Sequence, residues 1–130
     1  METVYDRNRV QIVRVTPNVY FRRGDMPARR QSNGAYIVSG GTVAAVDATT
    51  EEAAREMMQE SLEVFGHPLW YVFLTHGDGD HVSGLPVFLA EPLTIFCSHR
   101  LTDRILPAEY DGPAAVFGVE GVQTLRMGGL

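Results

Sequence analysis

Four side chains that can bind a metal ion lie within six residues of one another: His76, Asp78, Asp80 and His81. Imidazole and carboxylate groups bind divalent cations at about 2 Å, and the intervening glycines allow the backbone to turn these side chains inward. The apolar run 69–74 directly precedes the segment and indicates a buried strand. The alternative is a polar turn with two incidental histidines, but a turn requires neither histidine nor the neighbouring carboxylates. The spacing therefore predicts a metal site at the end of a strand.

This segment resembles the first metal-binding motif of the metallo-β-lactamase superfamily, written His-x-His-x-Asp-His. Residues 18–20, 32–38 and 41–49 resemble the opening strands of that family, including the strand that ends in an Asp beside the metal site. The resemblance implies that Asp47 lies behind the ligands, where it orients one of them or supports their loop. It extends over nearly the whole chain but covers only the N-terminal half of the family domain, because the C-terminal metal ligands are absent from the sequence.

Asp78 departs from the commonest pattern, since it stands where the family usually has its second histidine. The resemblance implies that His76, Asp78, Asp80 and His81 hold metal, and that Asp80 also acts in catalysis by orienting the nucleophilic water. An acidic residue at this position also occurs in the di-iron branch of the superfamily. We expect a divalent metal, with zinc first. Oxygen in place of nitrogen hardens the site and shifts the expectation toward iron or manganese, which stay as alternatives. Four donors from one loop rarely surround an ion, and occupancy should therefore be incomplete.

The apolar periodicities predict strands and helices in an α+β arrangement. Strands are expected at 10–15, 19–22, 35–38, 42–46, 69–74 and 93–97. Thr49 and Glu52 have capping-box spacing and predict a helix that ends at Gly66. Shorter helices are expected at 82–89 and from Ser98 to Leu106. We expect one domain over residues 1–130, a mixed β-sheet covered by helices. By the resemblance, it is half of an αββα sandwich.

The composition narrows the functional class and the location. The net charge is −5, which argues against nucleic-acid binding. A single cysteine, Cys97, is compatible with a reducing compartment, and no run approaches the roughly 18 apolar residues of a membrane span. We therefore expect a cytoplasmic protein that does not bind membranes. The remaining histidines, His67 and His99, match no ligand position of the family.

The resemblance implies hydrolysis of an ester, thioester, amide or phosphoester bond, with a metal-bound hydroxide as the nucleophile. With half of the family ligands missing, weak activity of this chain alone is expected. Two alternatives stay open: a noncatalytic binding or assembly half-domain that retains the motif, and a di-iron redox relative. The substrate is expected to be a small molecule. Four arginines in 22–31 would favour an anionic one, although a solvated basic loop is the favoured explanation, because exposed charge is the rule on protein surfaces.

The missing half also predicts a partner. One sheet face would normally be buried against the other half of the family domain, and here it would carry residues around Ile37, Val46, Val72 and Ile95. Left uncovered, this face would be a contiguous apolar patch larger than soluble monomers usually expose. A homodimer that packs sheet on sheet through this inner face is therefore expected.

Overall fold

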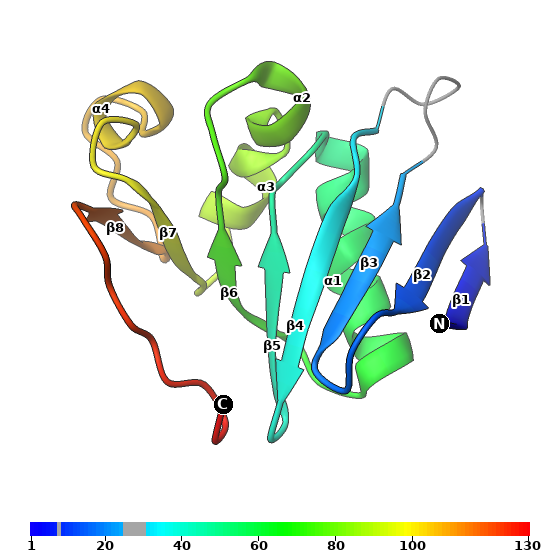
Figure 1. Cartoon of the computed structure of the whole chain (residues 1–130). Helices are drawn as coiled ribbons and strands as arrows, with labels where there is room; N and C mark the ends of the chain where they lie inside the picture. The colour runs from blue at the N-terminus through cyan, green and yellow to red at the C-terminus, as the bar shows by residue number, and fades with distance from the viewer. Residues whose placement is uncertain (8, 25–30) are drawn as a thin grey trace.

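The computed structural model describes residues 1–7, 9–24 and 31–130. These residues form one sheet whose strands lie in the order in which they occur along the chain (Figure 1). The strands are β1 Glu2–Arg7, β2 Val10–Arg14, β3 Val19–Arg23, β4 Gly34–Ser39, β5 Thr42–Val46, β6 Leu69–Phe73, β7 Thr94–Ser98 and β8 Ala115–Val119. Neighbouring strands are antiparallel from β1 to β5 and parallel from β5 to β8. The mixed sheet with helices confirms the predicted fold class.

The helices follow the strands of the parallel part. They are α1 Glu51–Phe65, α2 Gly79–Val82, α3 Leu85–Leu89 and α4 Thr102–Ile105. Figure 1 shows α1 and α3 behind the sheet, while α2 and α4 follow the C-terminal ends of β6 and β7. The longest described helix, α1, has 15 residues, and none of the described helices has the length and apolar character needed to cross a membrane.

Local details of the helices differ from the prediction. Thr50, not Thr49, is the N-cap of α1, and its hydroxyl accepts a hydrogen bond from the backbone N–H of Ala53. Thr49 instead pairs in a β-bridge with Val82, which delays the start of the helix. The helix ends as predicted at Gly66, in the left-handed conformation at φ 74°.

Other elements differ as well, among them strand β8, which was not among the predicted strands. Only Thr102–Ile105 is helical within the helix expected from Ser98 to Leu106, although the Ser98 hydroxyl accepts from the backbone N–H of Arg100. Strand β1 was not predicted, because its apolar residues do not alternate. It forms by antiparallel pairing with β2.

One face of the sheet packs against the helices and forms the core. Tyr36, Val72 and Ile95 on the strands and Met57 and Phe88 on the helices are all fully buried. Strand registers place Tyr36 beside Ala45, Ala45 beside Val72, and Val72 beside Ile95 on this same face. The prediction that Val72 and Ile95 belong to the inner, uncovered face is therefore wrong: the α helices cover them.

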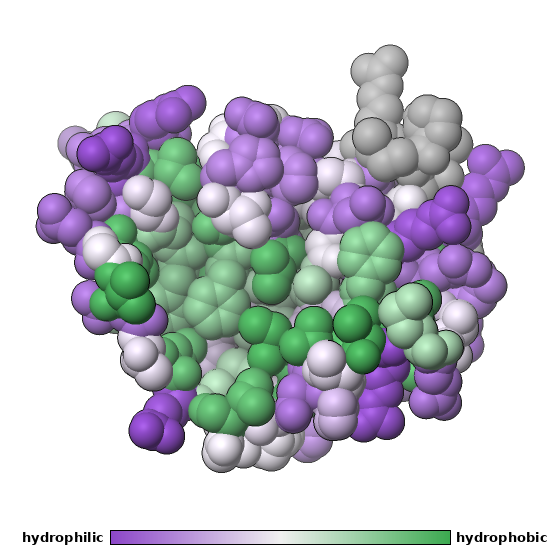
Figure 2. Space-filling model, viewed as in Figure 1, coloured by the Kyte–Doolittle hydropathy of each residue, from purple (hydrophilic) through white to green (hydrophobic). Residues whose placement is uncertain are grey.

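The opposite face, which we call the open face, carries a row of aromatic rings. Ring centroids are 5.3 Å apart for Phe73 and Phe96 and 5.7 Å apart for Phe96 and Phe117, and Tyr71 lies beside them. The registers place Ile37 and Val46 on this face, as predicted. Figure 2, drawn from the same side as Figure 1, shows the apolar centre of this face between hydrophilic borders.

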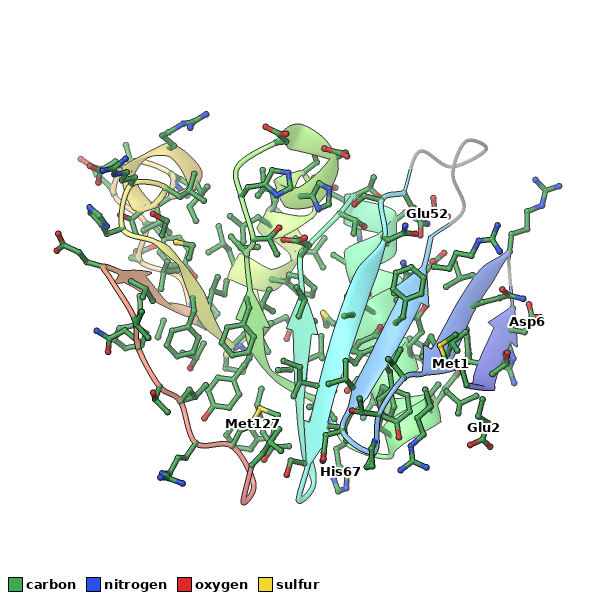
Figure 3. All side chains as sticks on the ribbon, in the orientation of Figure 1. Met1, Glu2, Asp6, Glu52, His67 and Met127 are labelled. Carbon is green, nitrogen blue, oxygen red and sulfur yellow. The ribbon has the colours of Figure 1, made fainter. Side chains whose placement is uncertain are left out.

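The C-terminal segment crosses part of the open face. The Ser39 hydroxyl donates to the carbonyl of Gly128 at 2.9 Å, and Met127 is only 5% exposed. Figure 3 shows Met127 against the sheet, near the turn between β4 and β5. Between this segment and the aromatic row remains a hollow of about 500 Å³. The segment thus covers one side of the open face and leaves Phe117 half exposed.

Candidate metal centre

The candidate ligands lie where the parallel strands end. Strand β6 stops at Phe73, whose carbonyl accepts a hydrogen bond from the N–H of Asp47 at the end of β5. His76 follows in an irregular segment, and the turn of α2 carries Asp80 and His81. Carboxyl ends of neighbouring parallel strands meet at the same edge of a sheet, and ligands commonly bind there. The five predicted site residues therefore gather at one edge.

Asp47 is the buried anchor of this edge. Its backbone has φ 67°, a left-handed conformation that Asp tolerates better than most residues. Its carboxylate, in a residue only 4% exposed, accepts hydrogen bonds from the backbone N–H of Thr75 at 2.8 Å and from the Thr75 hydroxyl at 2.8 and 2.9 Å. A buried carboxylate requires such partners. Asp47 thereby joins the end of β5 to the start of the ligand loop.

His81 is fixed by the same carboxylate. Its Nδ1 lies 2.7 Å from Oδ2 of Asp47, and its carbonyl accepts from the backbone N–H groups of Ala48 and Thr49 at 2.9 and 3.1 Å. With Asp47 ionised, Nδ1 carries the proton and Nε2 keeps its lone pair. That Nε2 lies 3.4 Å from a carboxylate oxygen of Asp80. The geometry thus leaves Nε2 as the atom of His81 that is available to a metal ion.

His76 is oriented in a similar way by its neighbour. Its Nδ1 lies 2.8 Å from the hydroxyl of Thr75, and its Nε2 lies 3.4 Å from Oδ2 of Asp78. The imidazole rings of His76 and His81 have centroids 4.2 Å apart. Each histidine therefore presents Nε2 toward a loop carboxylate while its Nδ1 is held from behind.

These donors form two overlapping groups that fit a divalent cation. Ligand atoms of Asp47, His76 and His81 lie within 4.8 Å of one another, as do those of His76, Asp78 and Asp80. Mixed nitrogen and oxygen donors at this spacing suit zinc, iron or manganese. The side chains of Asp78 and Asp80 are 79% and 52% exposed, so the described donors approach from one side and leave the other open. Their assignment as ligands stays a prediction.

The remaining histidines lie away from this cluster. Figure 3 shows His67 at the end of the sheet opposite α2, where its ring lies against Gly41 in the turn between β4 and β5. His99 is exposed, with Nδ1 3.3 Å from the carbonyl of Val119. Cys97 is 3% exposed, and burial raises the pKa of its thiol. Cys97 is therefore a thiol of the core.

The sequence interpretation overlooked two supporting residues. Thr75 bonds both Asp47 and His76, and the hydroxyl of Ser32 donates to the backbone carbonyl of Asp80. Thr75 directly precedes His76, and this position of its hydroxyl could have indicated a supporting role. Ser32 is 48 residues from Asp80, and no local pattern connects the two.

The arginines expected to attract an anionic substrate include one that cannot do so. Arg22 is fully buried on the helix face, where its guanidinium bonds both carboxylate oxygens of Glu60 at 2.8 to 3.2 Å and Glu56 at 3.1 Å. Arg23 is exposed at the end of β3. The other two, Arg29 and Arg30, lie outside the described residues. Pairing with acids of α1 removes Arg22 from any basic loop.

Comparisons with known proteins agree on the fold. The family described as the metallo-beta-lactamase superfamily matches residues 27–128. Among curated proteins none matches the sequence. A metallo-beta-lactamase from Pontibacter korlensis superposes with a TM-score of 0.74 at 14% identity, over 92% of this chain and 57% of its own.

Two further solved structures give the same picture. A metallo-beta-lactamase from Erythrobacter litoralis has a TM-score of 0.64 at 20% identity, over 82% of this chain and 49% of its own. The mono-zinc form of an enzyme of this kind from Pseudomonas aeruginosa has a TM-score of 0.64 at 17% identity, over 83% and 50%. The chain thus spans about half the length of the solved structures that it resembles.

Proposed function

Because the chain belongs to the metallo-β-lactamase superfamily, we propose that it is the metal-binding half of a metal-dependent hydrolase. The bond cleaved is an ester, thioester, amide or phosphoester. One observation carries the proposal: Nε2 of His76 and Nε2 of His81 each lie 3.4 Å from a carboxylate of the same loop, while both Nδ1 atoms are held from behind. Held in this way, the two Nε2 atoms and the two carboxylates face one another, as donors around a shared cation would.

Each residue has a separate role in the proposal. His76, Asp78, Asp80 and His81 hold the metal, and Asp47 orients His81 and the start of the loop through Thr75. A divalent cation in this position supplies a water of lowered pKa and polarises the bond to be cleaved. Asp80 is the proposed catalytic residue, because its half-exposed carboxylate beside His81 can accept a proton from water and orient it toward the substrate.

Zinc is our first choice of metal, with iron and manganese as alternatives. Two imidazoles suit zinc, whereas the two loop carboxylates, Asp78 and Asp80, favour harder ions. If the chain binds iron and absorbs visible light, the result would instead support the hypothesis of a di-iron redox protein. Since the described donors approach from one side, we expect water or another molecule to complete the coordination.

The open face favours a second candidate, a half-domain that acts in assembly and does not catalyse. We propose that a second copy of the chain is the partner on that face. The proposed substrate is a small molecule, and the proposed location is the cytoplasm. Dimer formation alone does not decide between the two candidates, because the aromatic row lies on a face of the sheet and the ligand loop lies at its edge.

Metal content and a hydrolysis screen separate the two candidates. The chain would be prepared with zinc, manganese or iron and tested on chromogenic esters, thioesters, phosphodiesters and β-lactams. We expect a slow metal-dependent rate that is lost in His76→Ala. His67→Ala is the matched control, because it removes an exposed imidazole far from the loop. Bound metal with no metal-dependent rate on any substrate would favour the assembly role.

A further inference from the structure

Ser32 makes a contact that the roles assigned so far do not use. Its hydroxyl donates a hydrogen bond to the backbone carbonyl of Asp80, across 48 residues of sequence. Ser32 is only 5% exposed. The acceptor belongs to a proposed metal ligand, in the short helix α2 that also carries His81. A buried hydroxyl therefore contacts the backbone of the ligand turn itself.

The residues on both sides of Ser32 are held in place. Gln31 is fully buried; its side-chain carbonyl accepts from Nη1 of Arg22 at 3.2 Å, and its amide donates to Glu56 at 3.4 Å. The side chain of Asn33 accepts from the backbone N–H of Gly24 at 3.1 Å. Ser32 thus has little freedom to move relative to the sheet.

The anchor behind Gln31 is a buried ionic cluster. Arg22 bonds Glu60 and Glu56 of α1, and the Tyr36 hydroxyl donates to Glu60. Buried ion pairs are costly to break when one partner is removed. The segment that carries Ser32 is therefore tied through Arg22 to the longest helix of the described chain.

The ligand turn is consequently held from two sides. The N–H groups of Ala48 and Thr49 bond the carbonyl of His81, and Ser32 bonds the carbonyl of Asp80. With its carbonyl directed at Ser32, Asp80 presents its carboxylate toward Nε2 of His81, 3.4 Å away. Rotation of the Asp80 peptide would disturb both the hydrogen bond from Ser32 and the approach of the Asp80 carboxylate to His81.

We propose that Ser32 is a positioning residue for the metal loop, fixing the Asp80 peptide so that the Asp80 carboxylate and His81 Nε2 converge. The inference rests on the proposed function for its metal, but the ordering of the turn does not depend on metal. Outer contacts of this kind commonly change metal affinity by about 10- to 100-fold.

The first test measures the turn without metal. Amide hydrogen exchange would be followed at His81 and Val82, whose N–H groups both bond the carbonyl of Asp78. In Ser32→Ala we expect their exchange to accelerate by roughly two- to tenfold, the equivalent of one lost hydrogen bond. Ser39→Ala is the matched control: that serine ends strand β4 and also donates to a backbone carbonyl, but far from the site.

The second test measures metal binding with cobalt(II) as the probe. We expect Ser32→Ala to bind cobalt about tenfold more weakly by calorimetry and to shift its visible ligand-field bands. Ser32→Thr, which retains the hydroxyl, should bind within about twofold of the parent, and Ser39→Ala should match the parent.

The two tests keep this inference apart from the proposed function. Unchanged exchange at His81 and Val82 in Ser32→Ala would overturn the positioning role, whatever the metal does. Equal loss of cobalt affinity in Ser39→Ala would also overturn it, because general destabilisation would then suffice. A parent chain that binds no metal would count against the proposed function, while the exchange experiment would still decide the role of Ser32.

Discussion

Asp47 and His81 lie 34 residues apart in the sequence, yet Oδ2 of the carboxylate and Nδ1 of the imidazole are 2.7 Å apart. The same carboxylate accepts hydrogen bonds from the backbone N–H of Thr75 and from its hydroxyl, whose proton is shared between the two carboxylate oxygens. One buried side chain therefore sets the orientation of a histidine and the path of the loop that precedes it. Without Asp47, the histidine could rotate and the loop would lose its attachment to β5.

Asp47→Asn tests this double role. The amide retains the size but offers a weaker, neutral acceptor to Thr75 and His81, so we expect the free energy of unfolding to fall by about 1.5–3 kcal/mol, the range for hydrogen bonds to charged groups. Zinc affinity should fall as well. Urea unfolding and calorimetry measure the two effects. Asp111→Asn, a change at an exposed aspartate, is the control and should leave both unchanged.

Asp78→His tests the unusual position of the motif. The parent chain should bind zinc weakly, because its donors approach from one side. A third imidazole in the donor set, beside His76 and His81, softens it, so zinc affinity should rise relative to manganese affinity. Calorimetric titration of both metals into parent and variant gives the ratio. An unchanged ratio would mean that residue 78 does not contact the metal, and Asp111→His controls for an added surface histidine.

Glu60→Gln tests the buried cluster. Burial alone disfavours a charged Arg22, but the hydrogen bond and charge of Glu60 outweigh it, and the net effect raises the pKa of Arg22. Removing that charge leaves a buried cation poorly compensated, so we expect a loss of roughly 3–5 kcal/mol in the free energy of unfolding. Glu63→Gln, on the same helix in an exposed pair with Arg7, should cost under about 1 kcal/mol. Similar losses for both variants would contradict the prediction.

The buried phenol of Tyr36 should lower the stability of the fold at alkaline pH. Burial, and then the charge of Glu60, raise the pKa of its phenol well above 10.0. A group with a raised folded pKa stabilises the fold below its unfolded pKa, here near 10.0, and this contribution is lost as pH rises toward the folded value. The free energy of unfolding should therefore decline above pH 10.0. Urea unfolding across this range measures the free energy of unfolding, and tyrosinate absorbance recorded in parallel follows the ionisation of the phenols. A free energy of unfolding that stays constant there would refute the raised pKa of Tyr36.

The open face leads to a prediction about assembly. We propose that a second copy covers the aromatic row, and light scattering at micromolar concentration should then give a dimer. Phe117→Glu should yield monomers, because Phe117 is 54% exposed on the open face. Trp70→Glu is the matched control: Trp70 is 57% exposed but lies beside α1 and the start of β7. A parent chain that is monomeric would leave the aromatic row without this partner.

Much of the fold was predictable because its signals are local. Apolar runs marked six of the strands, and Gly66 marked the end of α1. The misassigned face of Val72 and Ile95 has a physical reason: β6 and β7 are apolar on both faces, so their sequence alone does not say which side meets the helices. Alternation would have settled the orientation, as it does in half-exposed strands.

The candidate site, like the fold, was predictable from the sequence only in part. The spacing of the motif predicted that His76 to His81 would gather at a strand end, and the structure brings these side chains together with Asp47. Ser32 and the burial of Arg22 depend on contacts between residues far apart in sequence, with Asp80 and Glu60. The sequence places Arg22 beside a polar segment and so indicates an exposed side chain. Only the folded structure shows that acids of α1 pair with it.

The sequential order of the strands bears on how the chain is made. Every strand from β2 onward pairs with the one synthesised just before it, so the sheet can grow outward as residues leave the ribosome, without a later segment inserting between earlier ones. The antiparallel pairs from β1 to β5 need only short connections and should close early. The parallel pairs wait for the longer crossovers through α1, α3 and α4. In this order of assembly the strand that ends at Asp47 is paired first, and the loop that carries His81 is added beside it afterwards.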